Sequence, residues 1–193
     1  MITEECLETQ RLDPRVRRTR RLLEDALREL LGERAYSEIS VGEIAERATV
    51  NRATFYAHYT DKQDLTNALL RRELREAITS RVRPDADFNE RNLEVFTTVI
   101  FEWVARLMRD CPRHAGELVT SCGTSFQETI HEMIRAWLEV DVRAMRHFPN
   151  VPKGVAASVL AWSIYGSSLR WARKPQKISA EKAAAQVTAM LLR

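Results

Sequence analysis

The 193-residue chain has little of what marks several large classes of protein. Its three cysteines, Cys6, Cys111 and Cys122, are too few and odd in number for a disulfide framework. No apolar run approaches the roughly 18 residues that span a bilayer, and the acidic first 13 residues do not read as a secretory signal. These absences predict a soluble protein of the reducing cytoplasm, with no membrane partner.

The chain also lacks a large excess of charge of either sign. The chain has 30 Lys and Arg against 27 Asp and Glu, a formal net charge of +3. This near-balance excludes a histone-like polycation, so binding of nucleic acid would depend on local clusters of charge. One cluster, residues 11–21, holds six arginines and one aspartate. It could be only a solvated helix face, or an arm that follows a DNA backbone or enters the minor groove, with Arg15 and Arg18 as candidate contacts.

Helical patterns dominate the chain, and no run alternates convincingly as a strand would, so the predicted fold class is all-α. Asp13 is a suitable N-cap and Pro14 suits the first helical position, which predicts a helix to about Leu31. Gly32 would end it. Residues 60–63 have capping-box spacing and predict a long helix that Pro84 terminates.

Between these helices, the sequence predicts two short ones. Ser40 and Glu43 have the spacing of a capping box, which starts a helix over residues 41–48. After a break, Asn51 is a good N-cap for a second helix over residues 52–59. Two short helices joined by a tight turn form a helix-turn-helix, whose second helix fits a major groove about 12 Å wide.

Beyond Pro84 the composition changes, because ten of the fourteen aromatic residues lie there. Amphipathic stretches with short connections predict an antiparallel helical bundle. They cover residues 90–109, 112–120, 125–148, 152–172 and 179–192. The predicted organisation is a three-helix DNA-binding domain with its basic arm (1–60), a connecting helix (61–83) and a bundle for ligand binding and dimerisation (84–193).

The second short helix carries side chains that suit DNA. Amide, guanidinium and hydroxyl groups hydrogen-bond base edges or phosphates, and the flanking aromatic, imidazole and ammonium groups can reach phosphates. The first group is Asn51, Arg52 and Thr54, and the second is Tyr56, His58 and Lys62.

This segment resembles the DNA-binding module of the TetR family of bacterial transcriptional regulators. The family's Thr-aromatic-Tyr-x-His-aromatic stretch reads TFYAHY at residues 54–59, and its Lys-x-x-Leu follows at residues 62–65. The resemblance covers about residues 15–74. It implies phosphate contacts for Ser40 and Thr54, base contacts for Arg52 and Ala53, and DNA-backbone contacts for Tyr56, His58 and Lys62.

Two positions depart from the family's pattern. Thr49 replaces the Gly often found in the turn, and a β-branched residue with positive φ would cost about 1–2 kcal/mol. We therefore expect a slightly different turn. Gly42 stands where some members place a base-reading Arg, so base recognition would rest mainly on the second helix and the arginine-rich arm.

The aromatic and methionine positions of the bundle allow two interpretations. They could fill the core, or some could line an apolar cavity for a small molecule, which the family resemblance favours. The candidates are Phe96, Trp103, Met108, Phe126, Met133, Trp137, Trp162 and Tyr165.

Small and apolar residues on the last two predicted helices suit either packing within the chain or a four-helix interface between two copies. We favour a homodimer, because one short helix-turn-helix rarely supplies enough affinity alone. The candidate interface residues are Ala157, Leu160, Ala161, Ile164, Ser168, Val187, Met190 and Leu191.

Catalytic and metal-binding patterns are lacking. Cys111 and His114 have no second pair at ligand spacing, so we expect neither a metal nor a cofactor. Arg135 stands where the second His of a zinc-protease motif that begins at His131 would be, and no nucleophile elbow or phosphate loop occurs. The chain is therefore not expected to be an enzyme.

The favoured function is a homodimeric repressor that a small apolar ligand releases from a palindromic operator in double-stranded DNA. Two recognition helices would lie about 34–36 Å apart, one turn of DNA. The alternatives are the same DNA-binding dimer without an effector, and a helical-bundle metalloprotein.

Overall fold

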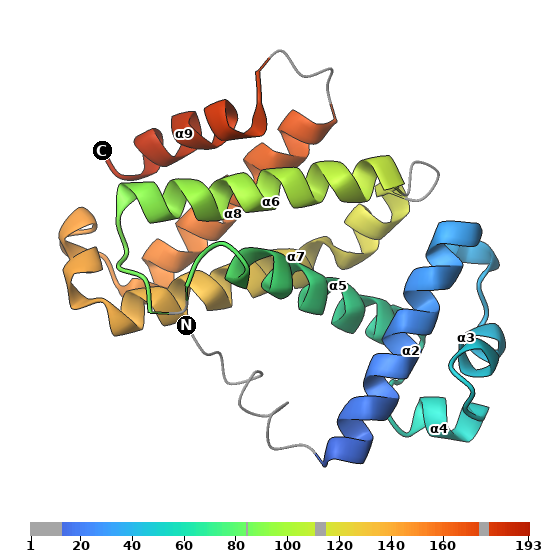
Figure 1. Cartoon of the computed structure of the whole chain (residues 1–193). Helices are drawn as coiled ribbons and strands as arrows, with labels where there is room; N and C mark the ends of the chain where they lie inside the picture. The colour runs from blue at the N-terminus through green and yellow to red at the C-terminus, as the bar shows by residue number, and fades with distance from the viewer. Residues whose placement is uncertain (1–12, 84, 111–114, 174–177) are drawn as a thin grey trace. The chain divides into compact units, whose positions relative to one another are not determined.

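The computed structural model describes residues 13–83, 85–110, 115–173 and 178–193, which form helices and no strands (Figure 1), as the sequence predicts. None of the described helices is both long and apolar enough to cross a membrane. In chain order the elements are α2 (Pro14–Glu33), η1 (Tyr36–Glu38), α3 (Val41–Arg47), α4 (Arg52–Tyr56), α5 (Lys62–Thr79), α6 (Glu90–Asp110), α7 (Ala115–Val140), η2 (Val142–His147), α8 (Lys153–Ala172) and α9 (Ala180–Leu191).

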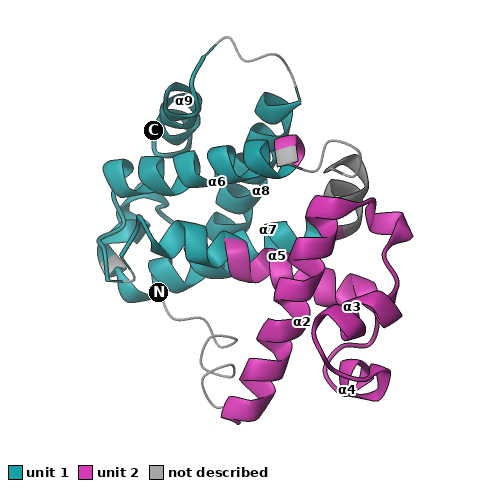
Figure 2. Ribbon diagram, turned by 45° about the vertical axis from the view of Figure 1, so that its right-hand side comes forward, with its two compact units in different colours: residues 1–3, 74–107, 124–193 teal, residues 4–73, 108–123 magenta. Residues whose placement is uncertain are grey.

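The chain divides into two compact units, which Figure 2 distinguishes by colour. The reading unit contains the described residues within 4–73 and 108–123, that is, α2 to α4 and the first part of α5. The bundle unit contains those within 74–107 and 124–193. The last residues of α6 (108–110) and the first residues of α7 (115–123) also belong to the reading unit, although they are distant in sequence from the rest of it.

Helix α2 begins where its sequence signals predict. The Oδ1 atom of Asp13 accepts a hydrogen bond from the backbone N–H of Arg15 at 2.7 Å, and Pro14 is the first helical residue. A stripe that includes Leu23 and Leu27 is buried. The expectation that Gly32 ends the helix is wrong, because helical backbone continues to Glu33 and only the next residue is extended.

The two short helices have the predicted caps. The Ser40 Oγ accepts from the Glu43 N–H, and the Glu43 carboxylate returns to the Ser40 N–H at 2.8 Å. The Oδ1 of Asn51 accepts from the N–H of Thr54 at 2.7 Å. Helix α4 ends at Tyr56 rather than at residue 59, and the N–H groups of His58 and Tyr59 both bond to the carbonyl of Phe55 at 3.0 Å.

The turn between α3 and α4 is left-handed at Thr49, where φ is 57°. The neighbouring backbone fixes it, because the Thr49 N–H bonds to the Glu46 carbonyl at 3.0 Å and the Val50 N–H bonds to the Ala45 carbonyl at 2.9 Å. The expectation of a different turn is therefore wrong. The threonine adopts the conformation that favours glycine, and the two hydrogen bonds hold it there.

Helix α5 begins with a cap other than the one expected from residues 60–63. The Oδ2 of Asp64 accepts from the Thr60 N–H at 3.0 Å, and the Oδ1 of Asp61 accepts from the Asp64 N–H at 2.8 Å. A carboxylate is a stronger acceptor for these N–H groups than the amide of Gln63. The helix ends at Thr79, before Pro84 is reached.

In the bundle unit, the expected separate helices at 112–120 and 125–148 are wrong. Residues 115–140 form one helix, α7, and the 3₁₀ helix η2 follows it; residues 112–114 lie outside the described part. The Trp137 Nε1–H on α7 donates to the carbonyl of Ala86 at 2.6 Å, and Asp141 accepts from the Phe88 N–H at 2.9 Å. These bonds fix the loop that precedes α6.

Replacing Thr49 with glycine is expected to raise the free energy of unfolding by about 1 kcal/mol. The strain of a β-branched residue at positive φ is relieved, and part of the gain is offset by the greater chain entropy of glycine in the unfolded state. Chemical denaturation measures the change. Thr49→Ala is the control, because it keeps a Cβ and should bring no comparable gain. An unchanged or lower stability of Thr49→Gly would contradict the strain argument.

Candidate nucleic-acid interface

Helix α4 presents an exposed surface that contains most of the predicted base contacts. Arg52 and Ala53 are exposed, Thr54 is half-buried, and Tyr56 is 58% exposed despite its large ring. Within the described part of the chain, Arg52 forms no hydrogen bond or ion pair, and its guanidinium lies over Gly42 of α3. The guanidinium donors of Arg52 are therefore available to a ligand.

Three other predicted contacts take part in local caps. The Ser40 hydroxyl donates to Glu43 at 2.7 Å, and the Oδ1 of Asn51 accepts from both the N–H and the hydroxyl of Thr54. These side chains thus set the start of α3 and α4. A phosphate only accepts hydrogen bonds, so to contact it either hydroxyl would have to turn its proton away from the cap, whereas the amide nitrogen of Asn51 can donate directly.

The arginine-rich arm forms the first turns of α2. The side chains of Arg15, Arg17 and Arg18 are exposed, and the described structure gives them no ion pair. Arg20 differs: its Nη2 donates to the His58 carbonyl at 3.4 Å, and its guanidinium lies 5.3 Å from the centre of the Tyr59 ring. The arm therefore combines three solvated charges with one that packs beneath the helix-turn-helix.

Lys62, expected to contact DNA, lies against the protein. Its ammonium donates to the carbonyls of Tyr36 and Ile39 at 2.6 and 2.7 Å, and it lies 4.1 Å from the centre of the Tyr36 ring. These contacts attach the first turn of α5 to the segment that enters α3. Lys62 therefore positions the helix-turn-helix, whatever it contributes to DNA.

A buried carboxylate joins three elements of the reading unit. Glu24 of α2 is only 7% exposed, and it accepts a hydrogen bond from the Tyr59 hydroxyl at 2.7 Å. The Nε of Arg72 on α5 lies 2.6 Å from the same carboxylate. Burial raises the pKa of Glu24, whereas the Tyr59 hydroxyl and the Arg72 charge oppose that rise.

His58 directly precedes Tyr59, and its backbone carbonyl accepts the hydrogen bond from Arg20. Burial, and after it the positive charge of Arg20, lowers the pKa of His58. Its imidazole is therefore mostly neutral at neutral pH in the free protein. A phosphate beside it would favour the charged form, so contact between His58 and DNA would be stronger at lower pH.

Sequence reasoning missed Glu24 and Arg72 as determinants of this site. One signal was available, because Glu24 interrupts the apolar stripe of α2 between Leu23 and Ala26. A carboxylate at a buried helical position needs partners, which predicts a hydrogen bond or an ion pair there. Nothing in the sequence identifies Arg72 as the partner.

Comparison with known proteins agrees with this architecture. Residues 23–69 match the family of bacterial regulatory proteins described as the tetR family. Over 70 residues the chain is 36% identical to the uncharacterised HTH-type transcriptional regulator YxbF of Bacillus subtilis (strain 168). That match covers 36% of the chain but only 18% of the relative's length. The family match lies within the reading unit and covers less than half of the chain.

Several solved structures have the same fold as this chain, and the similarity extends over nearly their whole length. Thermus thermophilus FadR, a TetR-family repressor in complex with lauroyl-CoA, is 22% identical with a TM-score of 0.61, and 90% of this chain and 93% of that one are covered. The fatty acid degradation regulator FadR of Bacillus halodurans is 17% identical with a TM-score of 0.58, and the coverages are 94% and 96%.

Most of the predicted ligand-pocket residues fill the core of the bundle unit. Ring centroids lie 4.9 Å apart for Trp103 and Phe126, and 6.2 Å apart for Phe126 and Tyr165. Met108 is half-buried in the reading unit, and Trp162 is 58% exposed. The buried members are Phe96, Trp103, Phe126, Met133, Trp137 and Tyr165.

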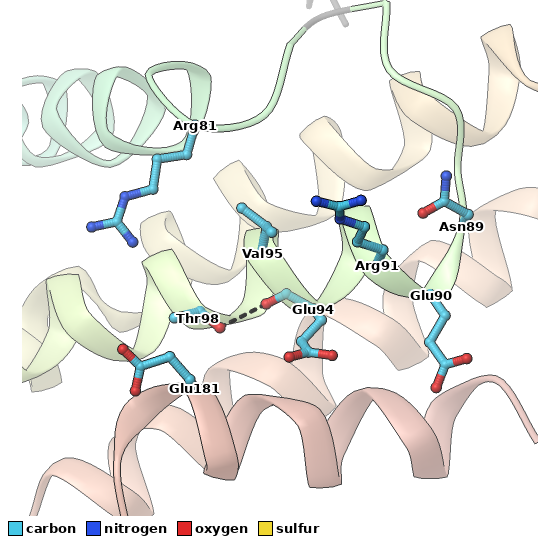
Figure 3. Close-up of a pocket in the computed structure, with 8 residues that line it drawn as sticks. All are labelled: Arg81, Asn89, Glu90, Arg91, Glu94, Val95, Thr98 and Glu181. Carbon is cyan, nitrogen blue, oxygen red and sulfur yellow. Dashed lines mark hydrogen bonds between the residues drawn. The ribbon is translucent and has the colours of Figure 1, made fainter.

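A pocket of about 850 Å³ opens on the bundle unit, but its lining is charged rather than aromatic (Figure 3). It is lined by the start of α6, by Arg81 in the segment that follows α5, and by Glu181 at the start of α9. None of the predicted aromatic positions contributes to it. The lining residues are Arg81, Asn89, Glu90, Arg91, Glu94, Val95, Thr98 and Glu181.

The predicted dimer residues divide into two groups. Five of α8 are buried within the chain at 1% exposure or less, because they face the bundle core: Ala157, Leu160, Ala161, Ile164 and Ser168. In this conformation they cannot contact a second copy. On α9, Met190 is 79% exposed, and Val187 and Leu191 are half-buried.

The structure describes only some of the residues on which the prediction of no metal site depends. Cys111 and His114 lie outside the described part of the chain. In the part that is described, no group of three or more His, Cys, Asp or Glu side chains could hold a metal ion. Cys122 is a buried free thiol, and its sulfur lies 3.1 Å from the Nε2 of Gln63.

Lys62→Met is expected to lower the free energy of unfolding by about 2–4 kcal/mol. The change removes the two charge-assisted hydrogen bonds from the Lys62 ammonium to the backbone carbonyls of Tyr36 and Ile39. Urea denaturation measures the change. Lys182→Met removes an exposed lysine of α9 and should leave stability unchanged. If Lys62→Met were as stable as the unaltered protein, the structural role of Lys62 would be wrong.

Proposed function

We propose that the chain is a sequence-specific DNA-binding transcriptional regulator. The observation that carries the proposal is the exposed surface of α4, where Arg52 and Tyr56 face solvent beside the unpaired arginines of α2. Such a surface combines base-reading groups with charges that attract phosphates. The buried Glu24 and the Lys62 anchor hold the helices beneath it.

The proposed active form is a homodimer. The outer face of α8 is apolar and exposed at Val155, Val159 and Trp162, with the spacing of one helical face, and Met190 of α9 is also exposed. Exposed large apolar side chains at this spacing suit a helix interface between two copies. The interface thus uses the opposite face of α8 from the one expected from the sequence.

We further propose that a small molecule with an apolar chain acts as effector and releases the operator. Support comes from the likeness of fold to Thermus thermophilus FadR, which was solved with lauroyl-CoA. The aromatic core of the bundle unit would be its binding region. The coupling between effector and DNA needs only about 1–3 kcal/mol for a 5- to 150-fold change in affinity.

One observation favours the alternative of a DNA-binding dimer without an effector. The aromatic residues in the predicted cavity contact one another, with ring centroids of Phe96 and Trp137 at 5.9 Å, and are nearly fully buried. An effector would have to separate these rings. Without one, the cellular amount of the protein or a protein partner would control repression.

Selection from a random duplex pool at near-physiological salt tests the proposed function. We expect enrichment of a palindrome whose half-sites are centred about 34–36 Å apart. Bulk binding that depends strongly on salt, with no enriched sequence, would contradict sequence-specific regulation.

The enriched duplex then separates the two modes of control. Release of the labelled duplex by acyl-CoA thioesters of graded chain length, together with a rise in the protein's melting temperature, would support an effector. If every chain length leaves both unchanged, the effector-free alternative is favoured.

Val159→Glu is expected to convert a dimer into a monomer, because it would bury an unpaired charge between two copies of α8. Light scattering after size-exclusion chromatography measures the mass. Val140→Glu is the matched control, since Val140 is also exposed but lies at the end of α7. A Val159→Glu variant that remains a dimer would show that another surface joins the copies.

A further inference from the structure

The guanidinium of Arg52 lies in the space that a side chain at position 42 would fill. A methyl group added at position 42 would overlap the Nη2 atom of Arg52 and come within 3.0 Å of its Cζ and Nε. The guanidinium of the recognition helix α4 therefore covers the first turn of α3, where Gly42 lies. The reading unit offers a contrast in Gly32 on α2, where an added methyl group would meet nothing within 4 Å.

The glycine is there for space and not for backbone conformation. No described glycine of the chain has a positive φ, so another residue would fit the backbone at position 42 without strain. Glycine inside a helix is also less favourable than alanine. The feature that the glycine provides is room for the Arg52 side chain.

We propose that Gly42 and Arg52 act together in base recognition. Because glycine has no side chain, position 42 leaves the space that determines where the Arg52 guanidinium contacts the DNA. This inference rests on the DNA binding proposed above. Arg52 is exposed and forms no ion pair within the described residues, so its donors can face a base edge. Gly42 thereby determines specificity without touching DNA.

The chemistry of the guanidinium indicates the base. Its planar fork matches the O6 and N7 acceptors of guanine in the major groove, which is the commonest specific contact of arginine. A phosphate would accept the same fork, but it carries no sequence information. We therefore assign to Arg52 one G·C pair in each half-site.

The test is a selection and binding comparison of the full chain with Gly42→Ala, Arg52→Ala and the double variant. Gly32→Ala is the matched control, because it makes the same substitution in the same unit away from Arg52. Melting temperatures confirm that each variant is folded. Each affinity is measured on the selected duplex, and on one with the assigned G·C pair changed to A·T, at several salt concentrations.

For the unaltered protein and Gly32→Ala, we expect a preference for G·C at the assigned pair of about tenfold or more. Gly42→Ala should lose most of this preference while the salt dependence of binding stays the same, because no phosphate contact is removed. The double variant should behave as Arg52→Ala does, since the glycine acts only through the arginine.

Three outcomes would overturn the inference. One is a Gly42→Ala variant that retains the preference, as Gly32→Ala does. Another is an equal effect of Gly42→Ala with and without Arg52. The third is a uniform loss of affinity for both duplexes with a shallower salt dependence, which would place Arg52 on phosphate. In all three the unaltered protein still selects a sequence, whereas failure of the proposed function would show as no selected sequence at all.

Discussion

The geometry of the reading unit depends on one buried carboxylate. Glu24 belongs to α2, its hydrogen-bond donor Tyr59 follows α4, and its ionic partner Arg72 belongs to α5. Removing one partner of such a group leaves a buried charge uncompensated, at a cost of about 3–5 kcal/mol. The three elements are therefore held in one arrangement, and the exposed face of α4 inherits its orientation from a contact on its buried side.

Further ion pairs extend this attachment along α5. Arg72 also pairs with Asp25 at 2.8 Å, and Glu73 pairs with Arg28, so consecutive residues of α5 bind α2. At the other end of the same segment, Lys62 binds the carbonyls of Tyr36 and Ile39. The part of α5 up to residue 73 is thus a structural member of the reading unit, whereas the sequence alone suggests a separate connecting helix over 61–83.

Local signals in the sequence predicted local structure well. The caps formed by Asp13, Ser40 and Asn51 depend only on residues two or three positions away, and all three are present. The contacts of Glu24 and Lys62 join residues 23 to 48 positions apart, which no periodicity can indicate. For α8, the small residues suggested an interface, but small side chains also let a helix approach its own bundle closely, and that is where they pack.

The two departures from the family's pattern have opposite physical consequences. Thr49 places a side chain where the backbone favours glycine, and the neighbouring hydrogen bonds of Val50 and Thr49 hold the strained turn. Gly42 removes a side chain where the backbone tolerates any residue, and Arg52 fills the space. Strain at Thr49 acts on the backbone of the turn and so on stability. The absence of a side chain at Gly42 instead leaves the space that the Arg52 guanidinium takes, which is why the proposed effect on recognition is assigned to Gly42.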